Sequence, residues 1–367
     1  MALNQVGLER LGTSVTDKIG ERKNLIINGA MQVAQRGTSS TAADYGTVDR
    51  FRPFHNGTDE APTQSQADVS PGTSPYTSGF RKTLRITNGN QTSGAGTADV
   101  IEFATRLEAQ DLANSGWNYT SASSFITLSF WVKSSVAQNF YGQLVTTDGT
   151  SQNYPFETGS LTADTWTKVI KTIPGNSNLQ FDNNANKGID IKWILFRGTD
   201  TTGSVSLNAW AANNNSVRMP NNTSTWYTTN DATFEITGVQ LEVGSVATDF
   251  EHRSFQEELK FCERYHRRIG SFNGVAASTT QVQAGIVISP EMRATPSVSL
   301  VPSSSARVTD CSHADYQNTG PTIGINNSSN VGLRIFINGF SGMTIQRIAV
   351  FLPSGTNFSV LHLSAEL

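Results

Sequence analysis

Residues 232–270 read ATFEITGVQLEVGSVATDFEHRSFQEELKFCERYHRRIG, a β-rich run that passes directly into a helical pattern. From Phe234 onward apolar residues alternate with polar ones. The apolar residues occupy even-numbered positions up to Ile236 and odd-numbered positions from Val239, so the alternation shifts by one residue at Gly238. Such a slip indicates an extra residue in one strand of a pair. The sequence therefore predicts a long strand with a bulge at Gly238.

The helical pattern begins at Ser254, which is followed three residues later by Glu257, the spacing of a capping box. Arginines gather toward the other end, and Gly270 can end the helix. The apolar positions share one stripe at i, i+4 and i+7, namely Phe255, Leu259 and Cys262. An amphipathic helix within residues 251–270 is expected to link two parts of the chain.

Composition favours an all-β protein. The chain has 367 residues, enough for two or three domains, and only 16% are charged, against roughly 25% in average soluble proteins. Ser, Thr, Asn, Gln and Gly supply the polarity, which suits many short strands joined by turns. The net charge of −3 gives no general attraction to nucleic acid. We therefore expect no nucleic-acid partner.

The chain has two cysteines, Cys262 and Cys311, which are too few to form a disulfide framework. The start of the chain lacks a basic region followed by an apolar one, and no run approaches the roughly 18 apolar residues of a spanning helix. The expectation is folding in a cytoplasm, without membrane insertion.

Strand patterns fill the region from residue 24 to residue 250. A strand at 25–27, a turn at Asn28-Gly29 and a strand resuming at Met31 open it. The clearest strand is Phe125–Lys133, in which apolar and polar residues alternate. Further candidate strands cover residues 83–87, 99–103, 140–146, 166–173 and 189–196. Their spacing suits a two-sheet sandwich better than βαβ repeats.

Both ends of the chain carry apolar positions that need a partner. Residues 1–23 carry four apolar residues at near-helical spacing among glycines, namely Leu8, Leu11, Val15 and Ile19. Such an arm cannot bury these residues by itself, so it is either frayed or docked on another surface, and their regular spacing favours docking. Residues 271–367 alternate as short strands and stay apolar to the end. This small β-domain is expected to tie its terminus into a sheet or a subunit interface.

Catalytic motifs are not found in the sequence, so we expect no catalytic residue, cofactor or metal. The five histidines are scattered. Cys311, His313 and Asp315 would face one side of an extended strand and could contribute to a zinc site completed by a symmetry mate. An ordinary polar loop explains these three residues equally well.

The aromatic residues divide into two groups. Trp131, Trp166 and Trp193 lie in or beside strand patterns and are interpreted as core or sheet-face residues. A second group lies among Asn, Ser and Thr: Trp117, Tyr119, Trp210, Trp226 and Tyr227. Rings beside amides and hydroxyls suit sugar binding, while the alternative is that they close the ends of the sandwich.

Several stretches together resemble virion structural proteins of tailed bacteriophages, of the tail-fibre, head-fibre and receptor-binding kind. The matching pieces are KNLIINGAMQVAQRG at 23–37, VDRF at 48–51, LSFWVK at 128–133, ITGVQLEVG at 236–244, FE at 250–251, CERY at 262–265, MRATP at 292–296 and SAEL at 364–367. These are backbone and core signatures, so the resemblance concerns architecture rather than a receptor.

The resemblance implies a jelly-roll β-sandwich of the carbohydrate-binding-module type over residues 24–250, with its first and last strands near each other. The helix at 251–270 would then lead to a C-terminal β-domain at 271–367 that serves trimerisation or receptor contact. In a homotrimer, the stripe of Phe255, Leu259 and Cys262 would pack around the axis or against the adjoining sheet. The arm at 1–23 would dock on another virion protein of head, neck or tail.

The function expected from the residues and the resemblance is that of a fibre subunit, located in the virion and assembled in the host cytoplasm, which attaches to the host surface and binds a glycan. The alternative is a capsid decoration or head-fibre protein that stabilises the particle. A polysaccharide depolymerase is disfavoured, since the sequence has neither a coil-length repeat nor an acidic cluster. We therefore expect a protein that is not an enzyme.

Overall fold

The computed structural model describes residues 23–353 and 360–367, which belong to two compact units. The jelly-roll unit contains the residues up to Gln32, Ser39–Asp44 and Phe51–Arg253. The C-terminal unit contains Val33–Thr38, Tyr45–Arg50 and Ser254–Leu367. It therefore includes two short segments that the sequence analysis assigned to the 24–250 body. The predicted docking positions Leu8, Leu11, Val15 and Ile19 lie outside the described residues.

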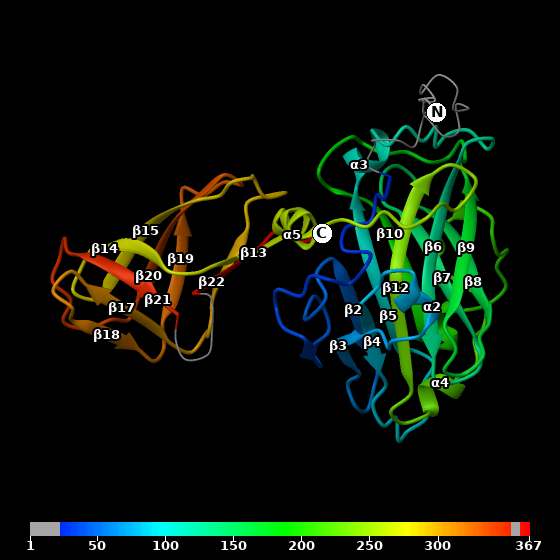
Figure 1. Ribbon diagram of the computed structural model, residues 1–367, viewed down its shortest axis with the longest axis horizontal. Helices are drawn as coiled ribbons and strands as arrows, with labels where there is room; N and C mark the ends of the chain where they lie inside the picture. Colours follow the sequence, from blue (N-terminus) through cyan, green and yellow to red (C-terminus); the bar gives the residue numbers. More distant parts are fainter. Residues whose placement is uncertain (1–22, 354–359) are drawn as a thin grey trace, which may run out of the picture. The chain divides into compact units, whose positions relative to one another are not determined.

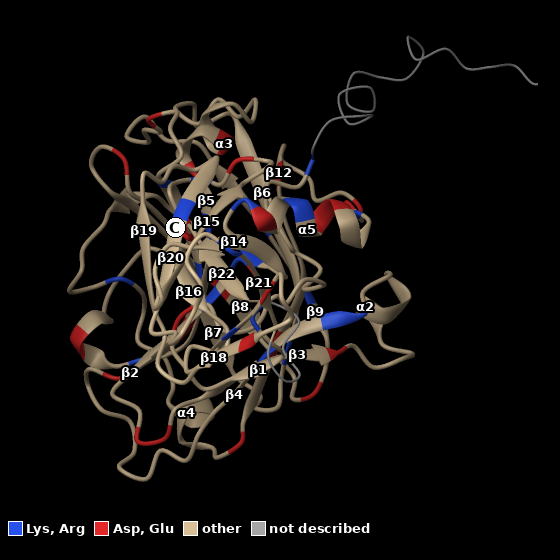
Figure 2. Cartoon of the chain, turned by 90° about the vertical axis from the view of Figure 1, so that its left-hand side faces the viewer, with Lys and Arg blue, Asp and Glu red and all other residues tan. Residues whose placement is uncertain are grey.

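Two antiparallel six-stranded sheets form the jelly-roll unit (Figure 1). The first sheet has the order β1 (Ser39–Ser40), β3 (Thr63–Asp68), β4 (Lys82–Thr87), β12 (Thr233–Val243), β6 (Phe125–Ser134) and β9 (Thr167–Pro174). The second sheet has the order β11 (Ala211–Ala212), β8 (Gln152–Ser160), β7 (Asn139–Thr146), β10 (Lys187–Arg197), β5 (Val100–Glu108) and β2 (Phe51–Asn56). Helices here are short: α2 (Ser74–Thr77), α3 (Ala109–Ala113) and α4 (Thr225–Thr228), with a 3-10 turn at Thr199–Thr201. The predicted all-β fold is confirmed, and Figure 2 shows how thinly charge is spread over it.

The predicted strands 83–87, 99–103, 125–133, 140–146, 166–173 and 189–196 correspond to β4, β5, β6, β7, β9 and β10. The predicted bulge is also present, since the register between β12 and β6 shifts between Thr237 and Gln240. Gly238 has a φ of 63°, and a Cβ there would lie 2.6 Å from the ring of Phe80. Both the backbone angle and the space therefore require glycine.

Large aromatic side chains fill the space between the two sheets. Trp193 stacks on Phe103 at 5.3 Å between ring centroids and meets the edge of Phe130, from the opposite sheet, at 5.6 Å. Phe234 contacts Phe103 and Phe140 at 6.0 and 4.9 Å. Each of these side chains is at most 2% exposed. Burial of this aromatic core is the main stabilisation of the sandwich.

Residues 24–32 do not form the predicted strands at 25–27 and from Met31. They run beside β12 as an irregular turn, in which Leu25 N donates to Leu241 O at 2.9 Å and Val239 N donates to Gly29 O at 2.9 Å. A Cβ at Gly29 would lie 2.0 Å from Val239 O. This prediction was wrong because contacts with β12, over 200 residues away, determine the conformation. The first and last segments of the jelly roll do lie side by side, as the resemblance implied.

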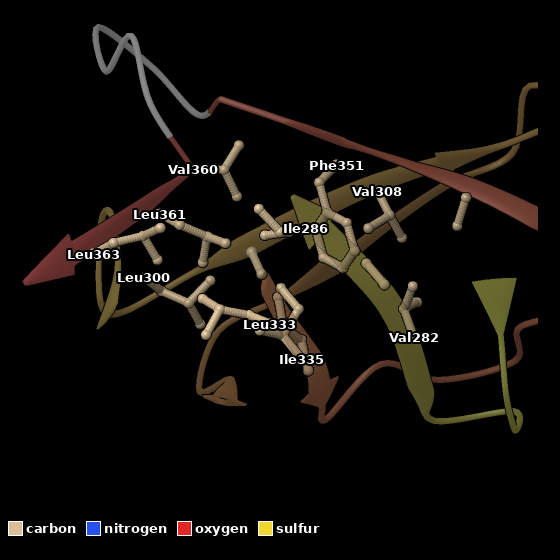
Figure 3. Packing of buried hydrophobic residues seen from close by; sticks show 14 of the residues in the cluster. Val282, Ile286, Leu300, Val308, Leu333, Ile335, Phe351, Val360, Leu361 and Leu363 are labelled. Carbon is tan, nitrogen blue, oxygen red and sulfur yellow. The ribbon is translucent and has the colours of Figure 1, made fainter. Parts of the chain in front are cut away.

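Two further sheets form the C-terminal unit. The three-stranded sheet has the order β13 (His266–Ile269), β22 (Leu361–Ser364) and β16 (Ser297–Leu300). The seven-stranded sheet has the order β18 (Asp315–Asn318), β17 (Ala306–Asp310), β21 (Ile348–Leu352), β14 (Phe272–Ala276), β15 (Gln281–Val287), β20 (Gly332–Asn338) and β19 (Thr322–Asn326). Their shared core includes Leu300, Leu333, Ile335, Leu361 and Leu363 (Figure 3). The end of the chain is tied into a sheet, one of the two predicted arrangements.

Helix α5 (Phe255–Glu263) begins with the predicted capping box, in which Ser254 Oγ accepts from Glu257 N and the Glu257 carboxylate accepts from Ser254 N. It ends at Glu263 instead of extending toward Gly270, because residues 266–269 pair with β22. The apolar stripe is also divided. Cys262 is fully buried, Leu259 is half-buried and Phe255 is 54% exposed. Only Cys262 is therefore a core residue.

A buried cluster of charged groups joins the N-terminal segments of the C-terminal unit to the end of the chain. The Arg50 guanidinium, 1% exposed, forms an ion pair with Glu366 and lies 3.4 Å from the ring centroid of Tyr265. Arg36 also pairs with Glu366, at 3.0 Å, and its guanidinium lies 3.7 Å from the Asp49 carboxylate in a longer ion pair. Four of the quoted motifs, at 23–37, 48–51, 262–265 and 364–367, thus meet in one place.

Removing one partner of this cluster should be costly. We predict that Glu366→Gln lowers the free energy of unfolding of the C-terminal unit by about 3–5 kcal/mol, because Arg50 is left buried without its carboxylate. Amide hydrogen exchange in β22 measures this loss. The matched control is Asp315→Asn, which breaks a half-exposed pair with Arg307 and should cost about 0–1 kcal/mol. Equal effects of the two variants would contradict the role of the cluster.

The same region should make stability depend on pH. Burial, followed by the nearby Arg36 charge, lowers the pKa of His266 to about 2 and that of His362 to about 4. Burial raises the pKa of Asp49 to about 6. Between pH 4 and 6.5 the unfolded chain therefore holds the protons of both histidines, while the folded chain holds only that of Asp49.

The net proton balance predicts that stability of the C-terminal unit rises as the pH increases from about 4.5 to 6.5. The urea midpoint measured across this range tests it. The variant His362→Gln removes one of the two histidine contributions and should flatten the rise. A midpoint that falls with increasing pH would show that Asp49 outweighs the histidines.

Candidate ligand-binding site

The outer face of the first sheet carries two tryptophans. In β6, Phe130 and Val132 point into the sandwich, so Ser129, Trp131 and Lys133 point outward. Trp131 is the register partner of Lys168 on β9, and Lys133 Nζ lies 5.3 Å from the ring centroid of Trp166. Both indoles are half-buried. They are therefore diagonal neighbours on one face, within reach of a single extended ligand.

A pocket of about 490 Å³ opens beside Trp131. Ser129 and Trp131 of β6 and Lys168 of β9 line one side. Most of the remaining lining comes from residues 77–80, 248–250 and 252, and Gly238 of β12 completes it. All of these belong to the jelly-roll unit. The size and the mixture of aromatic and polar groups are those of a site for a small ligand or one sugar unit.

Packing of aromatic rings holds the pocket in shape. The ring of Phe80 meets Phe250 edge-on at 4.8 Å and lies 5.2 Å from the ring of His252. His252 Nε2 donates to the Ser78 carbonyl at 3.0 Å. Trp131 packs against the small buried cluster that contains Phe80. The wall is thus preformed, which lowers the entropy cost of binding.

Two charged groups line the pocket, the Lys168 ammonium and the Asp249 carboxylate. Among the described residues, no hydrogen bond or ion pair engages the Lys168 ammonium or the Asp249 carboxylate. An ammonium group donates and a carboxylate accepts, so both senses of hydrogen bond are offered beside an aromatic face. Sugar rings present C–H groups to aromatic faces and hydroxyls to such polar groups. The arrangement therefore suits a saccharide.

Three of the five aromatic residues predicted to bind sugar are buried. Trp117, Trp226 and Tyr227 are 3%, 0% and 1% exposed. Their polar atoms donate to neighbouring groups: Trp117 Nε1 to Ser124 O at 3.3 Å, Trp226 Nε1 to Thr233 O at 3.1 Å and Tyr227 OH to Asp99 Oδ2 at 2.8 Å. The sugar-contact prediction for these three was wrong. Polar loops around an aromatic residue can bury it by satisfying its N–H or O–H.

The other two, Tyr119 and Trp210, are half-buried and lie in different surroundings. Tyr119 contacts Trp117 at 6.2 Å and meets Phe181 edge-on at 4.9 Å. Trp210 packs on Tyr154 at 5.2 Å and donates its Nε1 to Pro174 O at 2.7 Å. Neither lines the pocket at Trp131. A sugar-binding role for these two stays a prediction.

The pocket tryptophan was assigned only to the core or a sheet face by its sequence context. The position of Trp131 in the apolar–polar alternation of its strand could have identified it as a candidate ligand contact. Trp131 occupies a polar position of an alternating strand, two residues from Lys133 and from Ser129. A large aromatic residue at a solvent-facing strand position needs either a covering element or a ligand.

Cys311, His313 and Asp315 do not share one side of an extended strand. They lie in and after the turn between β17 and β18, where His313 has a φ of 62° and Asp315 pairs with Arg307. The Asp310 carboxylate caps this turn by accepting from the Ser312 hydroxyl and also from Ser312 N and Ala314 N, and the hydrogen bond from the hydroxyl contributes most to lowering its pKa. Within residues 23–353 and 360–367, no three His, Cys, Asp or Glu side chains are placed to hold a metal ion. No helix in that part of the chain has the length and apolar character required to cross a membrane.

No family model matches the chain, and no curated protein matches it. Solved structures similar to it include the enzymatically active domain of tailspike protein 4 of bacteriophage CBA120, at 8% identity and a TM-score of 0.30, covering 60% of this chain. The chain spans only 21% of that tailspike chain. A putative sugar binding protein from Bacteroides thetaiotaomicron matches at 13% identity and a TM-score of 0.30, covering 60% of this chain and 100% of its own.

The N-terminal cellulose-binding domain of β-1,4-glucanase C from Cellulomonas fimi matches at 10% identity and a TM-score of 0.28, covering 59% of this chain and 99% of its own. At these TM-scores the similarities carry no argument about ligand or activity. The class of the protein follows from its own sheets: an all-β chain with a jelly-roll sandwich.

Proposed function

We propose that this chain is a saccharide-binding attachment subunit of a tailed-bacteriophage virion, and that the pocket beside Trp131 contacts the host-surface glycan. One observation carries the proposal: an outward-facing indole lines a preformed pocket together with a cation and a carboxylate that no described side chain pairs with. The resemblance of residues 23–367 to phage fibre proteins supports the virion role. The arm at residues 1–23 would dock on another virion protein of head, neck or tail.

Binding rather than cleavage fits the pocket better. Hydrolysis of a glycosidic bond generally uses two carboxyl groups on either side of the bond. Asp249 is the single carboxylate among the described residues that line the pocket. We therefore propose that the subunit holds a glycan without hydrolysing it.

The proposal is tested by Trp131→Ala, with Phe255→Ala as the control, in a glycan array and a host-adsorption assay. Loss of an aromatic anchor should weaken glycan binding about tenfold or more. The control removes an exposed aromatic side chain of the C-terminal unit, outside the pocket, and should retain binding. Unchanged binding by the Trp131 variant, or loss in the Phe255 variant alone, would refute the assignment.

We also propose that the C-terminal unit meets other copies of the chain, as a homotrimer. Ile348 and Val275 are register partners on β21 and β14, and their side chains are 56% and 44% exposed. The next residue across this row, Gln283, is uncharged. An exposed apolar row on a flat sheet face is typical of an interface.

Oligomer formation is tested with the double variant Val275→Asp, Ile348→Asp in analytical ultracentrifugation. Placing carboxylates on this row should dissociate the trimer to monomer, because like charges would face each other across copies. The control is Val246→Asp, 65% exposed in the jelly-roll unit, which should leave the mass unchanged. A wild-type chain that sediments as a monomer would refute the trimer.

A further inference from the structure

The outer face of the second sheet carries a connected polar cluster, well separated in sequence and strand from the Trp131 pocket. Gln143 of β7 is the register partner of Lys192 on β10. Lys192 Nζ lies 2.8 Å from a carboxylate oxygen of Glu102 on β5, and Arg197 pairs with the same carboxylate. Three neighbouring strands therefore supply one charged surface.

The segment after β10 adds a second guanidinium. The Thr201 hydroxyl accepts from Arg197 at 3.3 Å, and the Thr201 carbonyl accepts from Arg218 N at 2.9 Å. Asn153 Nδ2, on β8, donates to the Arg218 carbonyl at 2.8 Å. The backbone of Arg218 is thus fixed over the sheet. Its side chain is half-buried and that of Lys192 is 17% exposed, so the cluster opens to solvent.

Positive charge exceeds negative charge in this cluster. Lys192, Arg197 and Arg218 are accompanied by a single carboxylate, that of Glu102. Partial burial, and next the Arg197 charge, lower the pKa of Arg218. Cations that are partly removed from water and repel each other are stabilised by a bound anion.

Four polar atoms of the cluster are buried without a partner in the described part of the chain. Two are donors, Nε of Arg197 and Nε of Arg218, and two are acceptors, Oε1 of Gln143 and Oδ1 of Asn153. Buried polar atoms are nearly always hydrogen-bonded. A ligand that satisfies both kinds must bring an acidic group and hydroxyl groups together.

We propose that this cluster, centred on Arg197 and Arg218, binds a carboxylate-bearing saccharide residue such as a uronic acid. The carboxylate accepts from the guanidinium groups, which match its geometry, and the sugar hydroxyls donate to the amide oxygens of Gln143 and Asn153. A bare inorganic anion would satisfy the donors and leave these amide oxygens unpaired. The site is independent of the Trp131 pocket.

The test is calorimetric titration of the full chain with digalacturonate, with its neutral counterpart galactobiose and with sodium sulfate, at about 0.15 M salt to screen non-specific attraction. Digalacturonate should bind, and Arg218→Gln should weaken it about tenfold or more through loss of a charge-assisted hydrogen bond. Arg218→Lys, which keeps the charge, should retain more affinity. The control Arg334→Gln, an exposed residue of β20 in the C-terminal unit, makes the same chemical change outside both sites and should leave digalacturonate binding unchanged.

Equal affinity for digalacturonate and galactobiose would overturn the proposal, and so would an Arg218→Gln variant, folded by circular dichroism, that binds digalacturonate as the wild type does. Sulfate binding as tight as digalacturonate binding would reduce the cluster to a simple anion site and overturn the saccharide class. Any of these outcomes, with Trp131-dependent glycan binding intact, leaves the proposed function standing.

Discussion

The filled interior of the sandwich is the constraint on which the functional surfaces depend. Trp193 occupies the space between the sheets together with phenylalanines from both of them, so no ligand can enter there. Because side chains alternate along a strand, every second residue is released to the outer faces. Such outward-facing positions supply Trp131 and Lys168 to the pocket, and Lys192 and Gln143 to the cluster, while residues outside the strands complete both. One core therefore permits two sites of different chemistry, one aromatic and one cationic.

A second constraint explains the motifs that carry the resemblance to phage fibre proteins. Arg36, Arg50, Tyr265 and Glu366 come from four separate motifs and meet in one buried cluster of the C-terminal unit. The Asn24 side chain, in the same motif as Arg36, donates to Val239 O and accepts from Leu241 N, both in the motif at 236–244. These residues hold distant segments together. The motifs that carry the resemblance therefore indicate the fold. The nature of the ligand has to be inferred from the outward-facing side chains.

Local patterns predicted the features that local physics determines, and missed those that distant segments determine. Alternation located β6 and the bulge at Gly238, and the spacing of Ser254 and Glu257 located the start of α5. The end of α5 could not be predicted because β22, about 100 residues later, draws residues 266–269 into a sheet. Burial of Trp226 could not be predicted because the Gln138 side chain, 88 residues earlier, accepts from Trp226 N. Most of the pocket at Trp131 comes from residues 77–80, 248–250 and 252, whose proximity only the fold reveals.

Saccharide binding on the outer face of the first sheet can be tested by NMR, by following the indole N–H resonances of the six tryptophans while a host-surface oligosaccharide is added. We expect shifts of Trp131 and Trp166, and unchanged resonances for the buried indoles of Trp193 and Trp226. Six unchanged resonances at saturating saccharide, or a shift confined to Trp210, would contradict it.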